Sequence, residues 1–393
     1  METSNRRDFI KSGTAAGLGF TINGLFSRKT HSEENSDFNR IFYRDFGSTE
    51  QKVSEIGFGA MNMRDPELVH AAIDKGINYI DTAHGYMKGV NEEIIGQVMK
   101  TKRDKVFLTT KISPRNPENM SEMIETSLRR LQTDHVDLLL LHGYGIKNRE
   151  QVLENAMLKI FDDARDKGYT RFVGFSTHKF DDEISEAALE SKFWEAVLVP
   201  YNYISPPSVT AAIKKVREAG LAVIGMKNLL NYNTRPRKSL EDIRENKNSP
   251  VTYAQAHLKW VLSNNYIDTI IPGVTSFEQL QENISIMGKK MSYEDHNILY
   301  RFSERIKGSH CFGLSGCTGC KGQCPKGVNV SDLNRCLGYA YGYGDRRLAE
   351  ENYINITPSN RIDICNDCDK CLVKCVHGLN LTENVQRARE LFA

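Results

Sequence analysis

Short runs of apolar residues alternate with amphipathic segments between about residue 41 and residue 305. Runs such as VDLLLLH (136–142) and DTIIPGV (268–274) are almost continuously apolar, which is typical of strands buried on both faces of a parallel sheet. The predicted strands cover residues 54–61, 79–83, 106–112, 136–142, 172–176, 196–203, 222–226 and 269–274.

The segments between these runs carry apolar residues at helical spacing with charges between them, for example Ser121–Leu131 and Val209–Ala219. Eight strand–helix repeats over about 250 residues are the count and length of a TIM barrel. A doubly wound sheet would show the same alternation, but no G-x-G-x-x-G follows the first strand. We therefore expect an α/β fold with a (β/α)8 barrel.

After about residue 307 the composition changes to Gly, Cys and Tyr, and all nine cysteines lie beyond residue 310. This segregation favours a metal-binding module over scattered disulfides. The formal net charge is only +2, with Lys and Arg spread along the chain, which gives no indication of a nucleic-acid surface or a polybasic membrane patch.

The run Cys365-x-x-Cys368-x-x-Cys371-x-x-x-Cys375 has the spacing of bacterial ferredoxins. There three closely spaced thiolates hold one [4Fe–4S] cluster, and the last cysteine ligates the other cluster of a two-cluster domain. A structural zinc site or disulfides are the alternatives, but zinc motifs usually pair two CxxC units across a longer loop. The run therefore predicts an iron–sulfur cluster and electron transfer.

An earlier run is incomplete. It consists of Cys317, Cys320 and Cys324, with a proline after the last cysteine. Leu314 stands where its first cysteine is expected, and either Cys311 or Cys336 could substitute. The number of clusters, one or two, stays open at this point.

In the usual crossover arrangement, Cys324 completes the cluster held by the later run. Cys375 then joins Cys317, Cys320 and a fourth ligand in a second cluster. The alternative is one cluster with leftover thiols. Residues 381–392 read as a closing amphipathic helix, which makes the module small and mainly helical.

The N-terminal residues 5–11, NRRDFIK, resemble the twin-arginine export signature, and a mild apolar stretch follows at Gly13–Phe26. That stretch is too short and interrupted for a stable membrane span. The alternative is a disordered tail with a chance arginine pair. We expect export of the folded, cofactor-loaded protein to the periplasm. The predicted divisions are a signal at 1–30, a linker at 31–40, the barrel at 41–305 and the iron–sulfur module at 306–393.

Polar residues gather where predicted strands end, which is where barrel enzymes place their chemistry. They are Asp81, Tyr86, Lys111 and His142. A lysine ammonium stabilises a tyrosine phenolate and lowers its pKa, an aspartate keeps that lysine charged, and a histidine can hydrogen-bond a carbonyl oxygen. Such a site delivers a proton to an oxygen while a hydride reaches the adjacent carbon.

The motif D-T-A-x-x-Y (81–86) and the strand ends TTK (109–111) and LLLLH (138–142) resemble those of the aldo-keto reductases. The resemblance implies Tyr86 as general acid/base, Lys111 and Asp81 as the residues that tune it, and His142 as the residue that orients the carbonyl. It also implies a nicotinamide cofactor bound across the barrel mouth without a Rossmann fold. The whole chain resembles a subset of the family in which a ferredoxin-like tail follows the barrel. Some members of that subset also have an export signal.

Only some of the family's cofactor-binding residues are matched in this sequence. Ser176 matches the family pattern at the nicotinamide carboxamide, whereas Thr177 replaces an asparagine, Leu198 a glutamine and Met226 an aromatic residue. The loop that would bind the phosphates and adenosine includes Gly273, Ser276, Gln279, Glu282 and Asn283. Thr275, Ser276 and Gln279 stand where a Lys or Arg clamps the 2′-phosphate of NADP, which favours NAD over NADP.

The sequence thus predicts an exported oxidoreductase that interconverts a small carbonyl compound and an alcohol, with clusters that relay electrons to a redox partner. The competing hypothesis is a barrel without catalysis that serves as an electron carrier or docking protein, favoured by Leu198 and Met226. A sugar-like substrate is a further hypothesis. It depends on aromatic residues that could form a platform, namely Tyr144, Trp194, Tyr201, Tyr203 and Tyr232.

Overall fold

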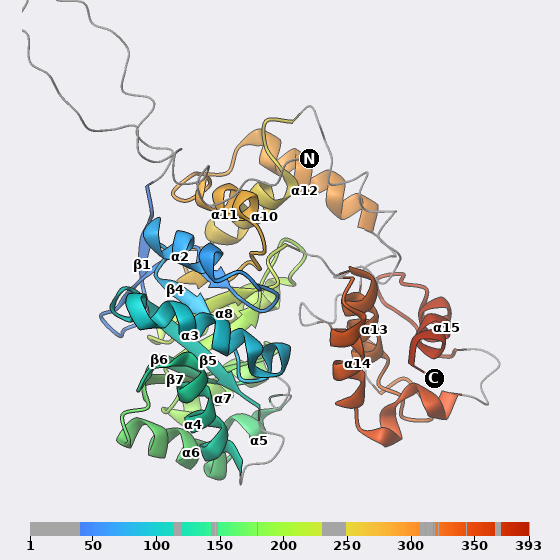
Figure 1. Cartoon of the computed structure of the whole chain (residues 1–393). Helices are drawn as coiled ribbons and strands as arrows, with labels where there is room; N and C mark the ends of the chain where they lie inside the picture. Colours follow the sequence, from blue (N-terminus) through green and yellow to red (C-terminus); the bar gives the residue numbers. More distant parts are fainter. Residues whose placement is uncertain are drawn as a thin grey trace, which may run out of the picture. The chain divides into compact units, whose positions relative to one another are not determined.

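A computed structural model gives the fold of the chain (Figure 1). It describes residues 40–113, 119–142, 146, 148–178, 180–229, 249–306, 311, 317, 319–320, 322–342, 344–365 and 371–392. The predicted export signature lies outside these residues, as do Leu314, Cys368, Tyr144 and Tyr232.

Eight strands form one sheet in the order β10-β9-β8-β7-β6-β5-β4-β3, so every strand lies beside its neighbour in sequence. They are β3 (Phe58–Gly59), β4 (Tyr79–Asp81), β5 (Phe107–Ile112), β6 (Val136–Leu141), β7 (Thr170–Ser176), β8 (Ala196–Pro200), β9 (Ala222–Met226) and β10 (Thr269–Ile270). Parallel bridges join Ile56 to Ile270 and Gly59 to Gly273, which links the last strand to the first. This is the strand order of a (β/α)8 barrel.

Most strand side chains are apolar on both faces, although β5 also buries Thr109, Thr110 and Lys111. Every residue of β5, β6 and β8 is buried, as expected for parallel strands covered by helices. The predicted strand at 54–61 is shorter in the structure. Ser54 ends β2 (Lys52–Ser54), which pairs antiparallel with β1 (Tyr43–Asp45), and only Phe58–Gly59 joins the parallel sheet.

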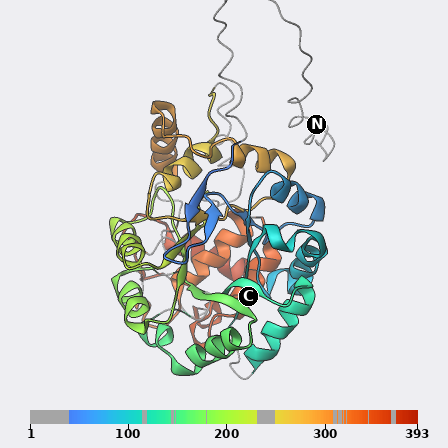
Figure 2. The same ribbon diagram turned by 90° about the vertical axis from the view of Figure 1, so that its left-hand side faces the viewer.

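Helices follow the strands along the chain. They are α2 (Pro66–Asp74), α3 (Val90–Lys102), α4 (Met120–Leu131), α5 (Arg149–Val152), α6 (Asn155–Asp166), α7 (Asp182–Ser191), α8 (Pro207–Glu218), α10 (Tyr253–Leu262), α11 (Phe277–Ile284) and α12 (Tyr293–Ile306). Helices α2, α3 and α4 pack side by side outside strands β4 to β6 (Figure 2). Side-chain caps fix several helix starts; Thr252, for example, forms a capping box with Gln255.

The C-terminal segment is helical and has its own core. Its elements are α13 (Val330–Leu337), the π-helical turn η5 (Gly338–Gly342), α14 (Arg346–Ile354), the short 3-10 turns η6 (Pro358–Asn360) and η7 (Ile362–Cys365), and α15 (Leu381–Phe392). The core contains Leu333, Leu337, Ile362 and Leu381. The predicted closing helix at 381–392 is confirmed.

Two compact units divide the chain: residues 1–142, 156–174 and 268–289 in one, and 143–155, 175–267 and 290–393 in the other. The predicted boundary between residues 305 and 306 stays a prediction. Among the helices that the structure describes, none combines the length and the apolar character that a membrane crossing requires.

Candidate active site

A buried ion pair lies at the ends of β4 and β5. Asp81 closes β4 opposite Thr109 of β5, and Lys111 lies two residues further on the same face of that strand. The Lys111 Nζ donates to Asp81 Oδ1 at 2.5 Å and to the carbonyl oxygen of Thr82 at 2.7 Å. Both residues are 1 % exposed, so the pair is formed away from water.

Burial and charge act in opposite directions on this pair. Burial lowers the pKa of Lys111, whereas the carboxylates of Asp81 and Glu92 raise it. Burial likewise raises the pKa of Asp81, and the Lys111 ammonium opposes that rise. Asp81 Oδ2 is buried and accepts no hydrogen bond from the described residues, so Lys111 is the main support of its charge.

A tight turn places Tyr86 next to the Asp81–Lys111 pair. It begins the 3-10 turn η1 (Tyr86–Gly89), in which Met87 and Lys88 have left-handed backbone angles with φ of 51° and 58°. Non-glycine residues adopt this region rarely, and it often marks functional sites. The Tyr86 Oη lies 3.4 Å from Lys111 Nζ, and the centre of its ring lies 4.9 Å from that nitrogen.

His142 follows β6 and is anchored through its backbone, which donates to the carbonyl oxygen of Ile112 at 2.8 Å. Its ring meets that of Tyr86 edge-on, with 5.8 Å between the ring centres and 78° between the planes. The structure therefore brings all four predicted catalytic residues together. Tyr86 is near both the Lys111 ammonium and the His142 imidazole.

A second polar layer, which the sequence interpretation missed, lies behind the ion pair. Glu92 of α3 is fully buried and accepts from Thr110 Oγ1 at 2.7 Å and from Arg130 Nη1 at 3.4 Å. Burial raises the pKa of Glu92. The available signal was its spacing, because Glu92 shares the buried face of α3 with Ile95 and Met99.

The residues predicted to bind the nicotinamide carboxamide lie at the ends of β7 and β9. Ser176 ends β7 and is 2 % exposed, and Met226 ends β9 and is partly exposed. The Thr177 backbone donates to the carbonyl oxygen of Leu198, and its hydroxyl donates to the carbonyl oxygen of Ile146 at 3.0 Å. That hydroxyl hydrogen is therefore already used within the chain.

The residues predicted to bind phosphate and adenosine lie before and on α11. Ser276 caps the helix by accepting from the Gln279 backbone, and Gln279 Oε1 accepts from the Thr275 backbone at 2.8 Å. Gly273 is exposed, Glu282 is partly exposed and Asn283 is buried. The free backbone N–H groups of a helix N-terminus suit a phosphate.

The described cysteines form no disulfide. The two cysteine runs approach each other, because the Lys374 backbone, next to Cys375, donates to the side chain of Gln323, next to Cys324, at 2.8 Å. Cys371 packs against the C-terminal core, and Cys365 is buried within it. Among the described residues, no three His, Cys, Asp or Glu side chains are grouped so as to hold a single metal ion.

Comparisons with known proteins match the barrel. The model of the aldo/keto reductase family matches residues 55–304. The uncharacterized oxidoreductase YqkF of Bacillus subtilis (strain 168) is 26% identical over 294 residues, which cover 64% of this chain and 93% of YqkF. The methylglyoxal reductase DkgB of Escherichia coli O157:H7 is 25% identical over 252 residues, which cover 62% of this chain and 90% of DkgB.

Solved structures give the same result. The aldo-keto reductase from Klebsiella pneumoniae in complex with NADPH superposes with a TM-score of 0.55 and 28% identity, and the match covers 66% of this chain and 95% of that one. This match and the two relatives above leave at least a third of the chain uncovered.

Proposed function

Because the chain belongs to the aldo/keto reductase family, we propose that it reduces a small carbonyl compound, or oxidises the corresponding alcohol, with a nicotinamide cofactor as hydride donor or acceptor. The observation that carries this proposal is the buried Asp81–Lys111 pair with the Tyr86 hydroxyl beside its ammonium. An oxidoreductase needs such a proton donor where the carbonyl oxygen gains charge.

The roles follow from the contacts. The Lys111 ammonium stabilises negative charge on Tyr86 Oη, and Asp81 keeps that ammonium charged against the cost of burial. In reduction, Tyr86 gives its proton to the carbonyl oxygen, and His142 donates a hydrogen bond to the same oxygen. A bound nicotinamide cofactor would supply the hydride for the carbonyl carbon. In alcohol oxidation the proton returns to the Tyr86 phenolate.

The cofactor choice is proposed from the chain's own residues. The Klebsiella relative holds NADPH. Here Thr275, Ser276 and Gln279 offer hydroxyl and amide groups at the N-terminus of α11, without the cation that a 2′-phosphate favours. We therefore propose NAD as the preferred cofactor.

The substrate proposed is a small carbonyl compound such as methylglyoxal, the compound in the name of one relative. The aromatic platform that suggested a sugar gains no support from two of its members. Trp194 is buried and donates to the carbonyl oxygen of Val152, and Tyr201 is buried with its hydroxyl bonded to Thr210. Both are packing residues.

The iron–sulfur module and export are further parts of the proposal. A single zinc ion, with Zn–S bonds of about 2.3 Å, would draw its thiolates into close contact. A cluster of four irons spreads its ligands more widely, which suits cysteines brought together on two adjacent loops. An exported enzyme must regenerate its cofactor in place, and we propose that the clusters pass the electrons to a periplasmic redox partner.

Replacement of the proposed proton donor tests the catalytic function. We expect Tyr86→Phe to lower kcat for methylglyoxal reduction by about 10²–10⁴-fold, because the general acid is lost, while NADH binding measured by fluorescence is kept. Tyr300→Phe, at an exposed position of α12, is the matched control and should leave kcat unchanged.

The same variant decides between the enzyme and an electron carrier with a non-catalytic barrel. The carrier hypothesis is favoured by Leu198 and Met226, and the Thr177 hydroxyl already donates to the carbonyl oxygen of Ile146. Unchanged turnover in Tyr86→Phe, or absence of turnover in the wild type with a panel of small aldehydes and alcohols, would favour the carrier.

A further inference from the structure

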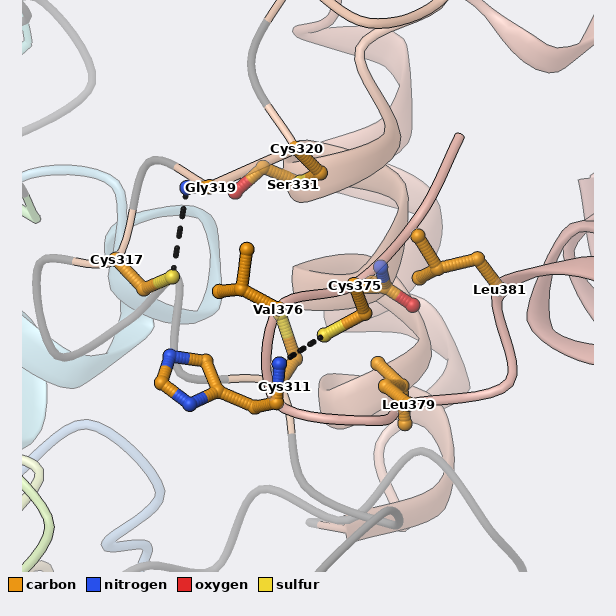
Figure 3. A pocket seen from close by; sticks show the side chains of 11 residues that line it. Cys311, Cys317, Gly319, Cys320, Ser331, Cys375, Val376, Leu379 and Leu381 are labelled. Carbon is orange, nitrogen blue, oxygen red and sulfur yellow. Dashed lines mark hydrogen bonds between the residues drawn. The ribbon is translucent and has the colours of Figure 1, made fainter. Parts of the chain in front are cut away.

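Four cysteines line one pocket in the C-terminal segment (Figure 3). They are Cys311, Cys317, Cys320 and Cys375. They come from two separate parts of the chain, 311–320 and 375, and the remaining wall includes the apolar side chains of Val376, Leu379 and Leu381. Four thiols around a largely apolar pocket are the ligand set of a [4Fe–4S] cluster.

The two loops that carry these cysteines lie in close contact. A Cβ at Gly319 would come within 2.8 Å of the Val376 side chain, so any larger residue would have to displace Val376. Gly319 lies between Cys317 and Cys320, and Val376 follows Cys375. In Figure 3 the side chain of Val376 lies between those of Cys317 and Cys375. This contact therefore holds Cys375 beside Cys317 and Cys320.

Backbone N–H groups are directed at two of the four sulfurs. Gly319 donates to Cys317 Sγ at 3.5 Å, and His377 donates to Cys375 Sγ at 3.4 Å (Figure 3). Hydrogen bonds to ligand sulfurs stabilise thiolates and tune the reduction potential of a cluster. The pocket therefore supplies both the ligands and part of their supporting shell.

Cys336 is the other cysteine that could replace the ligand missing at position 314. It lies outside the pocket. It is fully buried in the hydrophobic core with Leu333 and Leu337 and does not line the pocket. Full burial among apolar side chains is typical of a packing cysteine.

Resting on the iron–sulfur function proposed above, we infer that Cys311 is the fourth ligand of a second [4Fe–4S] cluster, together with Cys317, Cys320 and Cys375. The four thiols bind as thiolates, so their protons are released to solvent when the cluster is inserted. This ligand set leaves Cys324 for the cluster of Cys365, Cys368 and Cys371. The module then carries two clusters, although the earlier run lacks its first cysteine.

Iron and sulfide analysis of full-length protein, purified anaerobically, tests the inference. We expect the wild type to hold the iron of two clusters and Cys311→Ala to hold about half of it, because one of the two ligand sets is incomplete. After chemical reduction, Cys311→Ala should show the EPR signal of one cluster. That signal shows that the module is still folded. Cys336→Ala, the matched control, should keep the full iron content.

The outcomes separate the inference from the function on which it rests. A wild type without iron and sulfide would overturn the iron–sulfur function itself. Wild-type protein with two clusters, both retained in Cys311→Ala, would overturn the assignment of Cys311 alone. Loss of iron in Cys336→Ala but not in Cys311→Ala would transfer the role to Cys336. The double variant Cys311→Ala/Cys375→Ala should lose no more iron than either single variant, because both residues serve one cluster.

Discussion

Lys111 is the residue on which the proposed chemistry depends, because it must carry a charge where burial opposes one. The Asp81 carboxylate at 2.5 Å, the carbonyl oxygen of Thr82 and the more distant carboxylate of Glu92 stabilise its ammonium. A buried ion pair is costly to form and is retained where its charge has a use. Here that use is the hydroxyl of Tyr86, 3.4 Å away.

Removal of the partner charge should change the pH dependence of the enzyme. Burial lowers the pKa of Lys111 and Asp81 raises it, so Asp81→Asn should lower that pKa further. Activity requires the charged ammonium, so the loss of activity on the alkaline side should begin at lower pH in Asp81→Asn. We also expect kcat to fall by about 10²-fold or more, measured as a pH–rate profile of carbonyl reduction.

The chain offers a matched control for this experiment. Asp45 and Lys52 form an ion pair of the same length, 2.5 Å, at an exposed position of the β1–β2 hairpin. Asp45→Asn removes the same charge at the surface, where ion pairs contribute little. Its pH profile should match that of the wild type. The same profile in Asp81→Asn as in the wild type would contradict the role given to the ion pair.

Strand-end residues such as Asp81 could be located from the sequence, because parallel strands bring their carboxyl ends to one edge. Glu92 and Cys311 could not be assigned in this way. Glu92 lies on a helix face whose other residues are apolar, and burial of a carboxylate there depends on Thr110 and Arg130, which are distant in sequence. Cys311 departs from the ferredoxin spacing, so only the folded loops distinguish it from Cys336.

At the scale of elements, the strand boundaries show what apolar patterning resolves. The run at 222–226 coincides with β9 (Ala222–Met226), because the turn at Gly220 lies shortly before it and the polar Lys227 and Asn228 follow it. The run at 269–274 was too long, since only Thr269–Ile270 forms β10. Pro272 has no N–H to donate, and beyond it the pairing continues only as an isolated bridge between Gly59 and Gly273. A run of apolar residues thus predicts which residues are buried better than it predicts which of them form strand hydrogen bonds in the sheet.

The start of α11 carries the prediction on cofactor choice. We expect the wild type to have a higher kcat/KM with NADH than with NADPH. Gln279→Arg should shift the ratio towards NADPH by about tenfold, because a guanidinium forms charge-assisted hydrogen bonds with a 2′-phosphate. The measurement is kcat/KM with both cofactors at one substrate concentration range.

The control for that variant adds the same charge far away in sequence. Gln386→Arg lies on an exposed position of α15 and should leave the NADH to NADPH ratio unchanged. A wild type that already prefers NADPH would contradict the preference drawn from Thr275, Ser276 and Gln279. A shift in both variants would indicate a general effect of net charge on cofactor attraction.

At the scale of the whole molecule, the number of electrons connects the barrel with the C-terminal module. A hydride carries two electrons, whereas a [4Fe–4S] cluster commonly accepts one at a time. Two clusters can therefore accept both electrons of one hydride, whose proton is released to solvent, and a single cluster cannot. The second cluster, which depends on Cys311, would make the module match the chemistry proposed for the barrel.

This match gives a stoichiometric prediction for protein loaded with one equivalent of NAD under anaerobic conditions. One equivalent of the alcohol substrate should reduce both clusters of the wild type and leave the cofactor oxidised, as measured by EPR spin counts and absorbance of NADH. In Cys311→Ala the same addition should leave the cofactor as NADH and the remaining cluster oxidised, since one cluster cannot accept both electrons of a hydride. Wild-type clusters that stay oxidised while NADH accumulates would show that the module has a structural role and that the barrel works without it.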